Sequence, residues 1–291
     1  MGDSKLTNKV LLLGHMGKIG IALNEALKDS YEVIGKNTND FDAANFDEVK
    51  NLIKEIKPDI LINTVAFLGI DPCENEPIKA LTLNTLYPKL LAELSKDMDF
   101  LLVHFSTDAV FNDAKNDLYV ESDAPKPLNV YGFTKYGGDC FIRAIAKKYY
   151  IFRPAILFGR SKKNNQFVEK MMLKIKEGNK VIRVVDDIIS SPSYSIDIAN
   201  EAKRIIENSL PYGLYHLVNE GKASLFEIMQ EIVENLKLDV KVEKASYNDF
   251  PYKGIKNTNT PLTSEKIKPM RSWKEAIKDY TNHLKLDNKV N

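Results

Sequence analysis

The sequence of 291 residues has little cysteine and no long apolar segment. Its two cysteines, Cys73 and Cys140, lie far apart and form no Cys-x-x-Cys motif, so the sequence contains no disulfide framework. Sparse cysteine is typical of proteins from a reducing compartment. No apolar run approaches the roughly 20 residues that span a membrane, and the polar N-terminus does not resemble a signal peptide. We therefore expect a cytoplasmic protein that does not insert into a membrane.

An excess of charge of either sign is also absent. The 41 Lys and Arg residues nearly balance the 40 Asp and Glu residues, which leaves a formal net charge of +1. Basic residues are spread along the chain, so the sequence indicates no binding groove for nucleic acid. The His, Cys, Asp and Glu residues do not cluster at the spacing of metal ligands, and we expect no metal site.

Short apolar strands alternate with helical patterns through the first half of the chain. The strands are expected at residues 9–13, 31–35, 59–63, 100–105 and 150–153. Helical patterns lie between them, at residues 21–27, 45–57, 75–96 and from Tyr131 onward. This alternation predicts an α/β fold with a doubly wound parallel sheet of the Rossmann type, covered by helices on both faces.

The alternation loosens after Pro154. Helices are expected at residues 166–177, 196–206, 225–236 and around Trp273, and strands at 181–185 and 213–218, whereas 240–272 is expected to be irregular. We expect residues 1–155 to form a dinucleotide-binding domain and residues 156–291 to form a smaller, mixed, mainly substrate-binding region. Some strands and helices at about 180–218 are expected to return to the Rossmann sheet.

Three glycines, Gly14, Gly17 and Gly20, stand between the first predicted strand and the first predicted helix. Glycine permits a tight turn and lets backbone N–H groups approach a pyrophosphate, which the positive helix N-terminus also attracts. In this strand–turn–helix context the motif indicates a dinucleotide site, with a purely structural tight turn as the alternative.

The end of the second predicted strand bears on the choice of cofactor. An acidic residue there would bind the ribose hydroxyls of NAD, and a basic residue would suit the 2′-phosphate of NADP. The sequence has Lys36 and Asn37 at this place and no acidic residue before Asp40, and Lys18 adds a charge in the glycine turn. These residues favour NADP(H), with NAD(H) as the alternative, although Lys36 also fits a solvated loop.

Tyr131 and Lys135 are four residues apart at the start of a helical pattern, so their side chains project from one face. A neighbouring cation favours the phenolate, and such a pair can exchange a proton with an alcohol or ketone. Ser106 and Thr107 follow the fourth strand directly, at the strand edge where ligands bind in open α/β sheets. Alone, each of these features also fits an ordinary helix face or turn. His104, in the same apolar strand, is interpreted as a packing residue.

Together these segments resemble the extended short-chain dehydrogenase/reductase superfamily, and most closely its dTDP-4-dehydrorhamnose reductase family. The resemblance is nearly complete through about residue 210 and weaker beyond it. In order along the chain, the matching segments are Gly14-x-x-Gly17-x-x-Gly20, Lys57-Pro-Asp-Ile-Leu-Ile-Asn63, Ile70-Asp-Pro-Cys-Glu-Asn-Glu-Pro77, Asn84, His104-Phe-Ser-Thr-Asp-Ala-Val-Phe111, Glu121, Pro127-Leu-Asn-Val-Tyr-Gly-Phe-Thr-Lys135, Phe152-Arg-Pro154, Pro261-Leu-Thr-Ser and Trp273-Lys-Glu-Ala.

The resemblance implies reduction of the keto group of a nucleotide-activated 4-keto-6-deoxy sugar, for deoxysugar and surface-polysaccharide synthesis. Tyr131 would donate the proton, Lys135 would bind the nicotinamide ribose and lower the pKa of Tyr131, and Thr107 would hold the carbonyl oxygen. The implied cofactor-binding residues are Gly14, Gly17, Lys18, Ile19, Gly20, Lys36, Asn37, Asp42, Ala43, Val65, Ala66, Ser106, Tyr131 and Lys135. A homodimer is the default assembly for such an enzyme.

One segment departs from the family pattern. Where the family has Arg-Thr-Ser-Trp, this chain has Arg153-Pro-Ala-Ile156, so the aromatic residue expected to contact the sugar is replaced by Ile156. The departure fits a relative that reduces another nucleotide-linked keto-sugar. Two alternatives stay open: a nucleotide-sugar epimerase that retains its NAD, and a non-catalytic NADP-binding regulatory subunit.

Overall fold

A six-stranded parallel sheet forms the centre of the protein in the computed structural model, which describes residues 8–161 and 166–290 and, in the last helix, the side chains through Lys285. The strand order is β10-β5-β4-β3-β1-β2. The strands are β1 (Lys9–Leu13), β2 (Glu32–Lys36), β3 (Ile60–Asn63), β4 (Leu101–Phe105), β5 (Tyr149–Arg153) and β10 (Gly213–His216). The polar N-terminal residues 1–7, on which the absence of a signal peptide was argued, lie outside the described residues.

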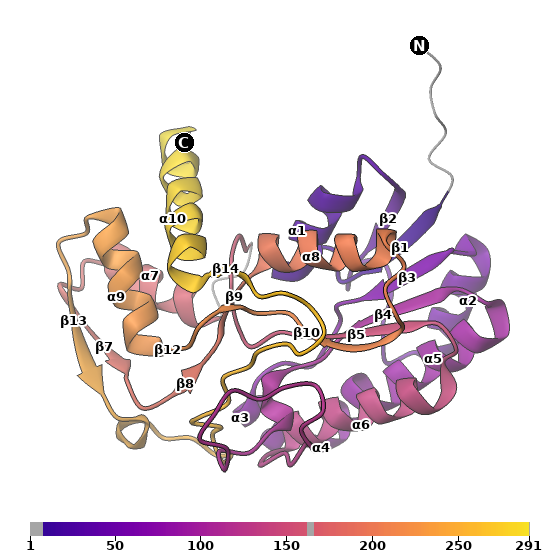
Figure 1. Cartoon of the computed structure of the whole chain (residues 1–291), viewed down its shortest axis with the longest axis horizontal. Coiled ribbons are helices and arrows are strands. Elements are labelled where there is room, and N and C mark those ends of the chain that lie inside the picture. Colours follow the sequence, from indigo (N-terminus) through magenta and orange to yellow (C-terminus); the bar gives the residue numbers. More distant parts are fainter. Residues whose placement is uncertain (1–7, 162–165, 291) are drawn as a thin grey trace.

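Helices cover both faces of this sheet, as Figure 1 shows. On one face lie α1 (Lys18–Leu27) and α8 (Ser195–Glu207), and on the other lie α2 (Phe46–Ile56), α5 (Tyr87–Met98) and α6 (Val130–Ile145). Alternate residues of β1 enter the two cores: Val10 and Leu12 pack on the α1–α8 side, Leu11 and Leu13 on the other. All four are fully buried, which explains the continuous apolar run of this strand. The expected doubly wound parallel sheet is confirmed.

The connection between β3 and α5 is less regular than the single helix expected at residues 75–96. It consists of α3 (Ile70–Asn75), α4 (Pro77–Leu81) and a π-helical turn, η1 (Thr82–Leu86), before α5 begins. Pro77 occupies the first position of α4, where its missing N–H costs nothing, and Glu76 before it has an extended φ of −127°. The proline therefore separates α3 from α4.

Four two-stranded sheets and three helices make up most of the rest of the chain. The strand pairs are β6 (Ile156–Phe158) with β9 (Pro192–Tyr194), β7 (Val181–Val185) with β13 (Lys241–Ala245), β8 (Ile189–Ser190) with β12 (Ala223–Ser224), and β11 (Asn219–Glu220) with β14 (Met270–Ser272). The helices are α7 (Phe167–Lys176), α9 (Leu225–Leu236) and α10 (Trp273–Val290). They enclose a separate apolar cluster that includes Phe158, Ile228 and Ile277.

One expectation for this part of the chain is corrected. Residues 240–272 are not wholly irregular, because β13 and β14 lie within them. Of the elements at about 180–218, β10 joins the large sheet and α8 packs on it, whereas β7 pairs with β13 outside it.

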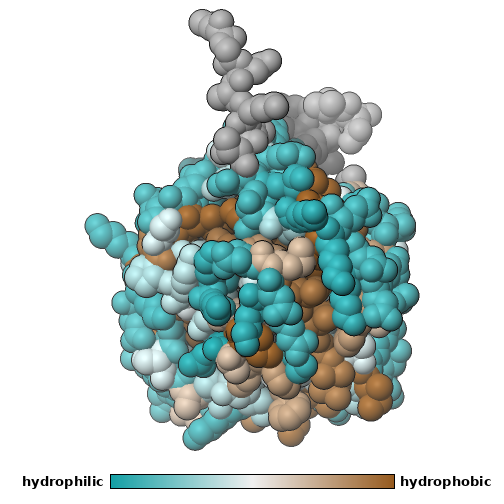
Figure 2. All heavy atoms as spheres, turned by 90° about the vertical axis from the view of Figure 1, so that its right-hand side faces the viewer, coloured by the Kyte–Doolittle hydropathy of each residue, from teal (hydrophilic) through white to brown (hydrophobic). Residues whose placement is uncertain are grey.

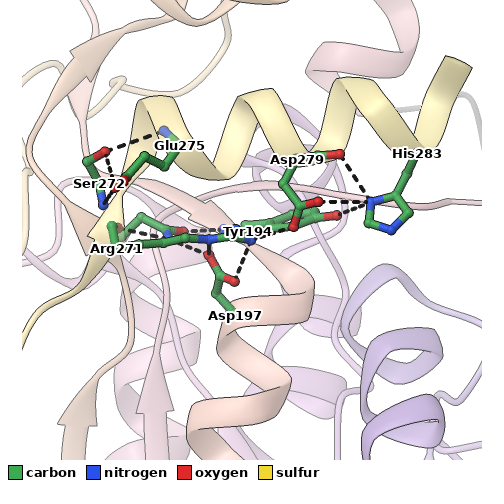
Figure 3. A network of polar contacts seen from close by, with 8 residues as sticks. Tyr194, Asp197, Arg271, Ser272, Glu275, Asp279 and His283 are labelled. Atoms are coloured by element: carbon green, nitrogen blue, oxygen red, sulfur yellow. Dashed lines mark hydrogen bonds and ion pairs between the residues drawn. The ribbon is translucent and has the colours of Figure 1, made fainter.

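Arg271 joins the last helix to the rest of the fold (Figure 3). Its guanidinium makes two hydrogen bonds of 2.8 Å to Asp197 of α8 and one of 2.7 Å to Asp279 of α10. The guanidinium also lies 5.6 Å from the ring centre of Tyr194, whose hydroxyl is 3.3 Å from Nδ1 of His283. These contacts fix α10 against α8 and β9.

The face of the molecule shown in Figure 2 is mainly hydrophilic, with apolar side chains gathered toward its lower right. Among the described residues, the helices are all too short or too polar to cross a membrane.

Candidate active site

The predicted site residues lie at one edge of the central sheet. Because β1 to β5 run parallel, their carboxyl ends meet there. This edge carries the glycine turn after β1, Lys36 and Asn37 after β2, Val65 and Ala66 after β3, Ser106 and Thr107 after β4, and the start of α6.

The glycine turn is tightly packed. Gly14 has φ +84°, and a Cβ there would lie 2.4 Å from Oγ1 of Thr64. A Cβ at Gly20 would lie 2.3 Å from the carbonyl oxygen of Gly14. The close approach of α1 to the ends of β1 and β3 therefore requires glycine at both positions.

The N-terminus of α1 is suited to an anion. Gly17 is the N-cap, no described side chain caps the helix, and its first turn has no acidic residue. In contrast, Asn45 caps α2 and Asn129 caps α6. The backbone N–H groups that open α1, from Lys18 to Gly20, are the donors that bind a pyrophosphate in dinucleotide folds. This part of the structure fits a dinucleotide.

The side chain of Lys18 does not point toward the end of β2, where the sequence predicted its charge. Its ammonium is buried, 2.9 Å from Oε1 of Glu169 in α7 and 3.2 Å from the carbonyl oxygen of Leu157. Burial lowers the pKa of Lys18, and the charge of Glu169 opposes this shift. The expectation that Lys18 adds a positive charge near the end of β2 is therefore not met, because its charge is directed to α7.

The end of β2 presents Lys36 beside Asp40. The ammonium lies 3.9 Å from Oδ1 of Asp40, and the other oxygen of this carboxylate accepts a hydrogen bond of 2.8 Å from the backbone N–H of Asn37. Asp40 therefore closes the turn after β2. The ring of His15 packs against Gly35, where a Cβ would lie 2.6 Å from it.

The other two predicted cofactor segments are held by local hydrogen bonds. Asp42 accepts one of 2.9 Å from the N–H of Ala44, and Asn63 accepts one of 3.0 Å from the N–H of Val65. Ala43 is buried. A pocket of about 530 Å³ opens beside Ala44 and is lined by α3, α4 and η1 residues Asn75, Glu76, Pro77, Ile78, Lys79 and Thr82.

Tyr131 and Lys135 lie on the first turns of α6, as predicted. Asn129 fixes the start of this helix by accepting a hydrogen bond of 2.8 Å from the N–H of Gly132. Thr107 lies close enough to the Tyr131 hydroxyl to influence its pKa, and Lys135 follows Tyr131 by one helical turn, so the three residues predicted to be catalytic lie near one another. Burial raises the pKa of Tyr131, and the side chain of Thr107 opposes this shift. The phenol is therefore protonated at neutral pH, as a proton donor requires.

Lys135 is fully buried and has two polar partners in the fourth strand. Its ammonium donates a hydrogen bond of 2.5 Å to the carbonyl oxygen of Phe105 and lies 3.2 Å from Nε2 of His104. Burial lowers the pKa of Lys135 to about 8, opposed by the charge of Asp139. Nδ1 of His104 lies 3.1 Å from Nδ2 of Asn63. The interpretation of His104 as a packing residue was therefore wrong.

Ser106 faces the interior. Its hydroxyl donates a hydrogen bond of 2.6 Å to Asp139, which forms a buried ion pair of 3.0 Å with Arg153. Arg153 in turn lies 3.3 Å from Nε2 of His216. Asp139 and Arg153 were missed from the sequence, although Asp139 stands four residues after Lys135 on the same helix face.

Among the described residues, no three His, Cys, Asp or Glu side chains are grouped so that they could hold a metal ion.

The arrangement of these parts defines a class of protein. An anion-binding glycine turn, a hydroxyl after the fourth strand and a Tyr-x-x-x-Lys pair on one parallel sheet are the parts of a dinucleotide-dependent short-chain dehydrogenase/reductase. The chain belongs to the family described as RmlD substrate binding domain, whose model matches residues 8–286. The resemblance to the dTDP-4-dehydrorhamnose reductases is thereby confirmed.

Curated relatives cover nearly the whole chain. A spore coat polysaccharide biosynthesis protein, SpsK of Bacillus subtilis, is 32% identical over 94% of this chain and 96% of its own length. A dTDP-4-dehydrorhamnose reductase of Aggregatibacter actinomycetemcomitans is 30% identical over 93% of this chain and 97% of its own length.

Solved structures agree with this assignment. The dTDP-4-dehydrorhamnose reductase of Bacillus anthracis, in complex with NADP, is 29% identical, with a TM-score of 0.89 over 95% of this chain and 99% of that one. The UDP-glucose 4-epimerase of Thermus thermophilus, at 16% identity and a TM-score of 0.80, shares the fold alone.

Proposed function

We propose that the protein uses NADPH to reduce the keto group of a nucleotide-activated 4-keto-6-deoxy sugar, in the synthesis of a deoxysugar for a surface polysaccharide. The observation that carries this proposal is the position of Tyr131, near Thr107 and one helical turn before the buried Lys135. The relatives named dTDP-4-dehydrorhamnose reductase support the substrate class.

The chain's own groups have distinct tasks in this reaction. The N–H groups of residues 18–20 hold the pyrophosphate of the cofactor, which supplies a hydride to the carbonyl carbon. Thr107 donates a hydrogen bond to the carbonyl oxygen and stabilises the charge that develops on it. Tyr131 transfers its proton to the same oxygen, and the positive charge of Lys135 stabilises the phenolate that remains.

The cofactor preference follows from the end of β2. Lys36 stands where an acidic residue would select NAD, and the nearest carboxylate, Asp40, is engaged by the N–H of Asn37. This arrangement favours NADPH and leaves NADH as the weaker cofactor.

Ile156 bears on which sugar is bound. This residue begins β6 and packs against the Phe158 cluster. An aliphatic side chain here contacts a sugar ring less extensively than an aromatic one, which supports a substrate other than the rhamnose precursor. We propose that residues 156–291 supply most of the substrate contacts and that the protein acts in the cytoplasm as a homodimer without nucleic acid.

The test is oxidation of NADPH and NADH by the purified protein against a panel of nucleotide 4-keto-6-deoxy sugars, with Tyr131→Phe alongside. Turnover on one sugar that is lost in the variant supports the reductase and identifies the sugar. Cofactor that co-purifies, with interconversion of sugars and no net NADPH consumption, would instead indicate an epimerase. Binding of NADPH without turnover of any sugar, together with a stoichiometric partner enzyme, would indicate a regulatory subunit.

A further inference from the structure

A segment of the C-terminal region, residues 253–257, is attached to the start of the catalytic helix. The Asn129 side-chain amide donates two hydrogen bonds of 2.9 Å, to the carbonyl oxygen of Ile255 and to Oδ1 of Asn257. Asn129 is also the N-cap of α6, two residues before Tyr131. Lys256, between these two acceptors, is therefore held at the end of α6 where the reaction is proposed to occur.

The same segment packs directly on α3. Oδ1 of Asp71 accepts hydrogen bonds from the N–H groups of Lys253, at 3.0 Å, and Gly254, at 3.4 Å. A Cβ at Gly254 would lie 2.4 Å from Cγ2 of Ile70. The residues on both sides of Lys256 are thus hydrogen-bonded to other elements, Ile255 and Asn257 to the start of α6 and Lys253 and Gly254 to α3.

The charge of Lys256 is only partly compensated. The side chain is partly buried, and its ammonium lies 4.6 Å from the ring centre of Tyr252. Within the described part of the chain, no carboxylate forms an ion pair with it. The buried Lys18, by comparison, is paired with Glu169.

The surroundings of Lys256 also include charges from two other elements. Burial lowers the pKa of Lys256, Asp71 of α3 opposes this shift, and the ammonium of Lys170 in α7 adds to it. A partly buried cation without an ion-pair partner is costly, and an anionic ligand would relieve this cost.

We propose that Lys256 binds the diphosphate of the nucleotide-activated substrate. The inference rests on the proposed function, because a nucleotide sugar carries its diphosphate next to the sugar ring. With the keto-sugar at Tyr131, a cation held by the N-cap of α6 meets that diphosphate. The pyrophosphate of the cofactor is the competing ligand, because it too is expected to bind at the carboxyl ends of the parallel strands.

The experiment measures binding of dTDP, UDP and NADP⁺ separately by calorimetry, in the wild type and in Lys256→Met, Lys256→Arg and Lys253→Met. Lys253 is the matched control, because it lies in the same segment but is exposed and its ammonium contacts Asn75. Loss of a charge-assisted hydrogen bond is expected to weaken nucleoside diphosphate binding about tenfold or more in Lys256→Met. Lys256→Arg recovers most of this loss, and Lys253→Met binds like the wild type.

The results separate this inference from the proposed function. Weaker NADP⁺ binding with unchanged nucleoside diphosphate binding in Lys256→Met would overturn the inference, as would unchanged binding of all three ligands. So would failure of the wild type to bind either nucleoside diphosphate. If dTDP or UDP binding depends on Lys256 but no keto-sugar is turned over, the inference stands and the reductase does not. An unchanged melting temperature for Lys256→Met assigns the loss to binding rather than to folding.

Discussion

Nε2 of His104 lies 3.2 Å from the ammonium nitrogen of Lys135, and both side chains are inaccessible to solvent. The other ring nitrogen of His104 faces the side-chain amide of Asn63. Because Oδ1 of Asn63 accepts the N–H of Val65, its Nδ2 group is the donor toward His104. Nδ1 of His104 is then an acceptor, and the proton of the neutral ring sits on Nε2, facing Lys135. This arrangement suits a neutral Lys135 and opposes its protonation.

The turnover number for ketone reduction is therefore expected to fall as the pH rises through about 8, the pKa of Lys135. Above this pH Lys135 loses the charge that stabilises the phenolate of Tyr131. In His104→Gln the amide oxygen can accept from the ammonium, so the pKa of Lys135 rises and the alkaline limb moves to higher pH. The pH–rate profile measures this shift, and a limb at the same pH in wild type and variant would contradict it.

His283→Gln is the matched control for that profile. His283 contacts Tyr194 and Asp279 rather than the site, so its replacement should leave the limb in place. Nitrogen NMR of labelled histidine gives an independent readout, because it distinguishes a ring protonated on Nε2 from one protonated on Nδ1.

The two adjacent hydroxyls after β4 are expected to differ in their importance for catalysis. Thr107→Val removes the hydroxyl that is proposed to hold the carbonyl oxygen and should lower the turnover number about 100-fold, with Thr107→Ser retaining most activity. Ser106→Ala should keep the turnover number within a few-fold, because the Ser106 hydroxyl is bonded to Asp139. Loss of this buried hydrogen bond to a carboxylate should instead lower the free energy of unfolding by about 1–3 kcal/mol. Steady-state kinetics and thermal unfolding of all three variants test this difference. A larger fall in the turnover number for Ser106→Ala than for Thr107→Val would show that Ser106 is the catalytic hydroxyl.

Local patterns in the sequence were sufficient for the parts of the site that lie within one turn or helix. Gly14 and Gly17 lie in the predicted turn and Gly20 in the first turn of the predicted helix α1, and Tyr131 and Lys135 lie one turn apart on α6, as their spacing predicts. Contacts between residues far apart in the sequence could not be predicted from local patterns. His104 is 31 residues from Lys135, and the oxygen that Lys18 contacts is 139 residues away. Nothing in the local sequence marks these partners.

The strand β13 was missed for a different reason. It pairs only with β7 in a two-stranded sheet, and of Lys241–Ala245 only Ala245 is buried. A strand that is only partly buried needs no continuous apolar run, so its composition resembles a loop. The central strands were found because they are buried on both faces.

Breaking the ion pair between Lys18 and Glu169 is expected to destabilise the fold. Glu169→Gln leaves the buried charge of Lys18 without its partner, at a cost of about 3–5 kcal/mol, whereas Lys18→Met with Glu169→Leu should be much less harmful. Lys203→Met is a control, since Lys203 is 3.7 Å from Glu207 at a more exposed position. Urea denaturation of these proteins tests the prediction. Equal stability of Glu169→Gln and the wild type would show that the pair is not buried in solution.

Lys36 is expected to determine the cofactor preference. Removing its charge in Lys36→Ala should raise the KM for NADPH about tenfold, because a charge-assisted contact with the 2′-phosphate is lost, and should leave the KM for NADH nearly unchanged. Lys50→Ala is the matched control, because Lys50 is also partly exposed and lies near a carboxylate, Asp47, but on α2 away from the end of β2. Initial rates measured at varied concentrations of each cofactor give the two KM values and their ratio. If Lys36→Ala raises both KM values equally, Lys36 stabilises the turn through Asp40 and does not bind the 2′-phosphate. The selectivity for NADPH must then reside in another residue of the cofactor site.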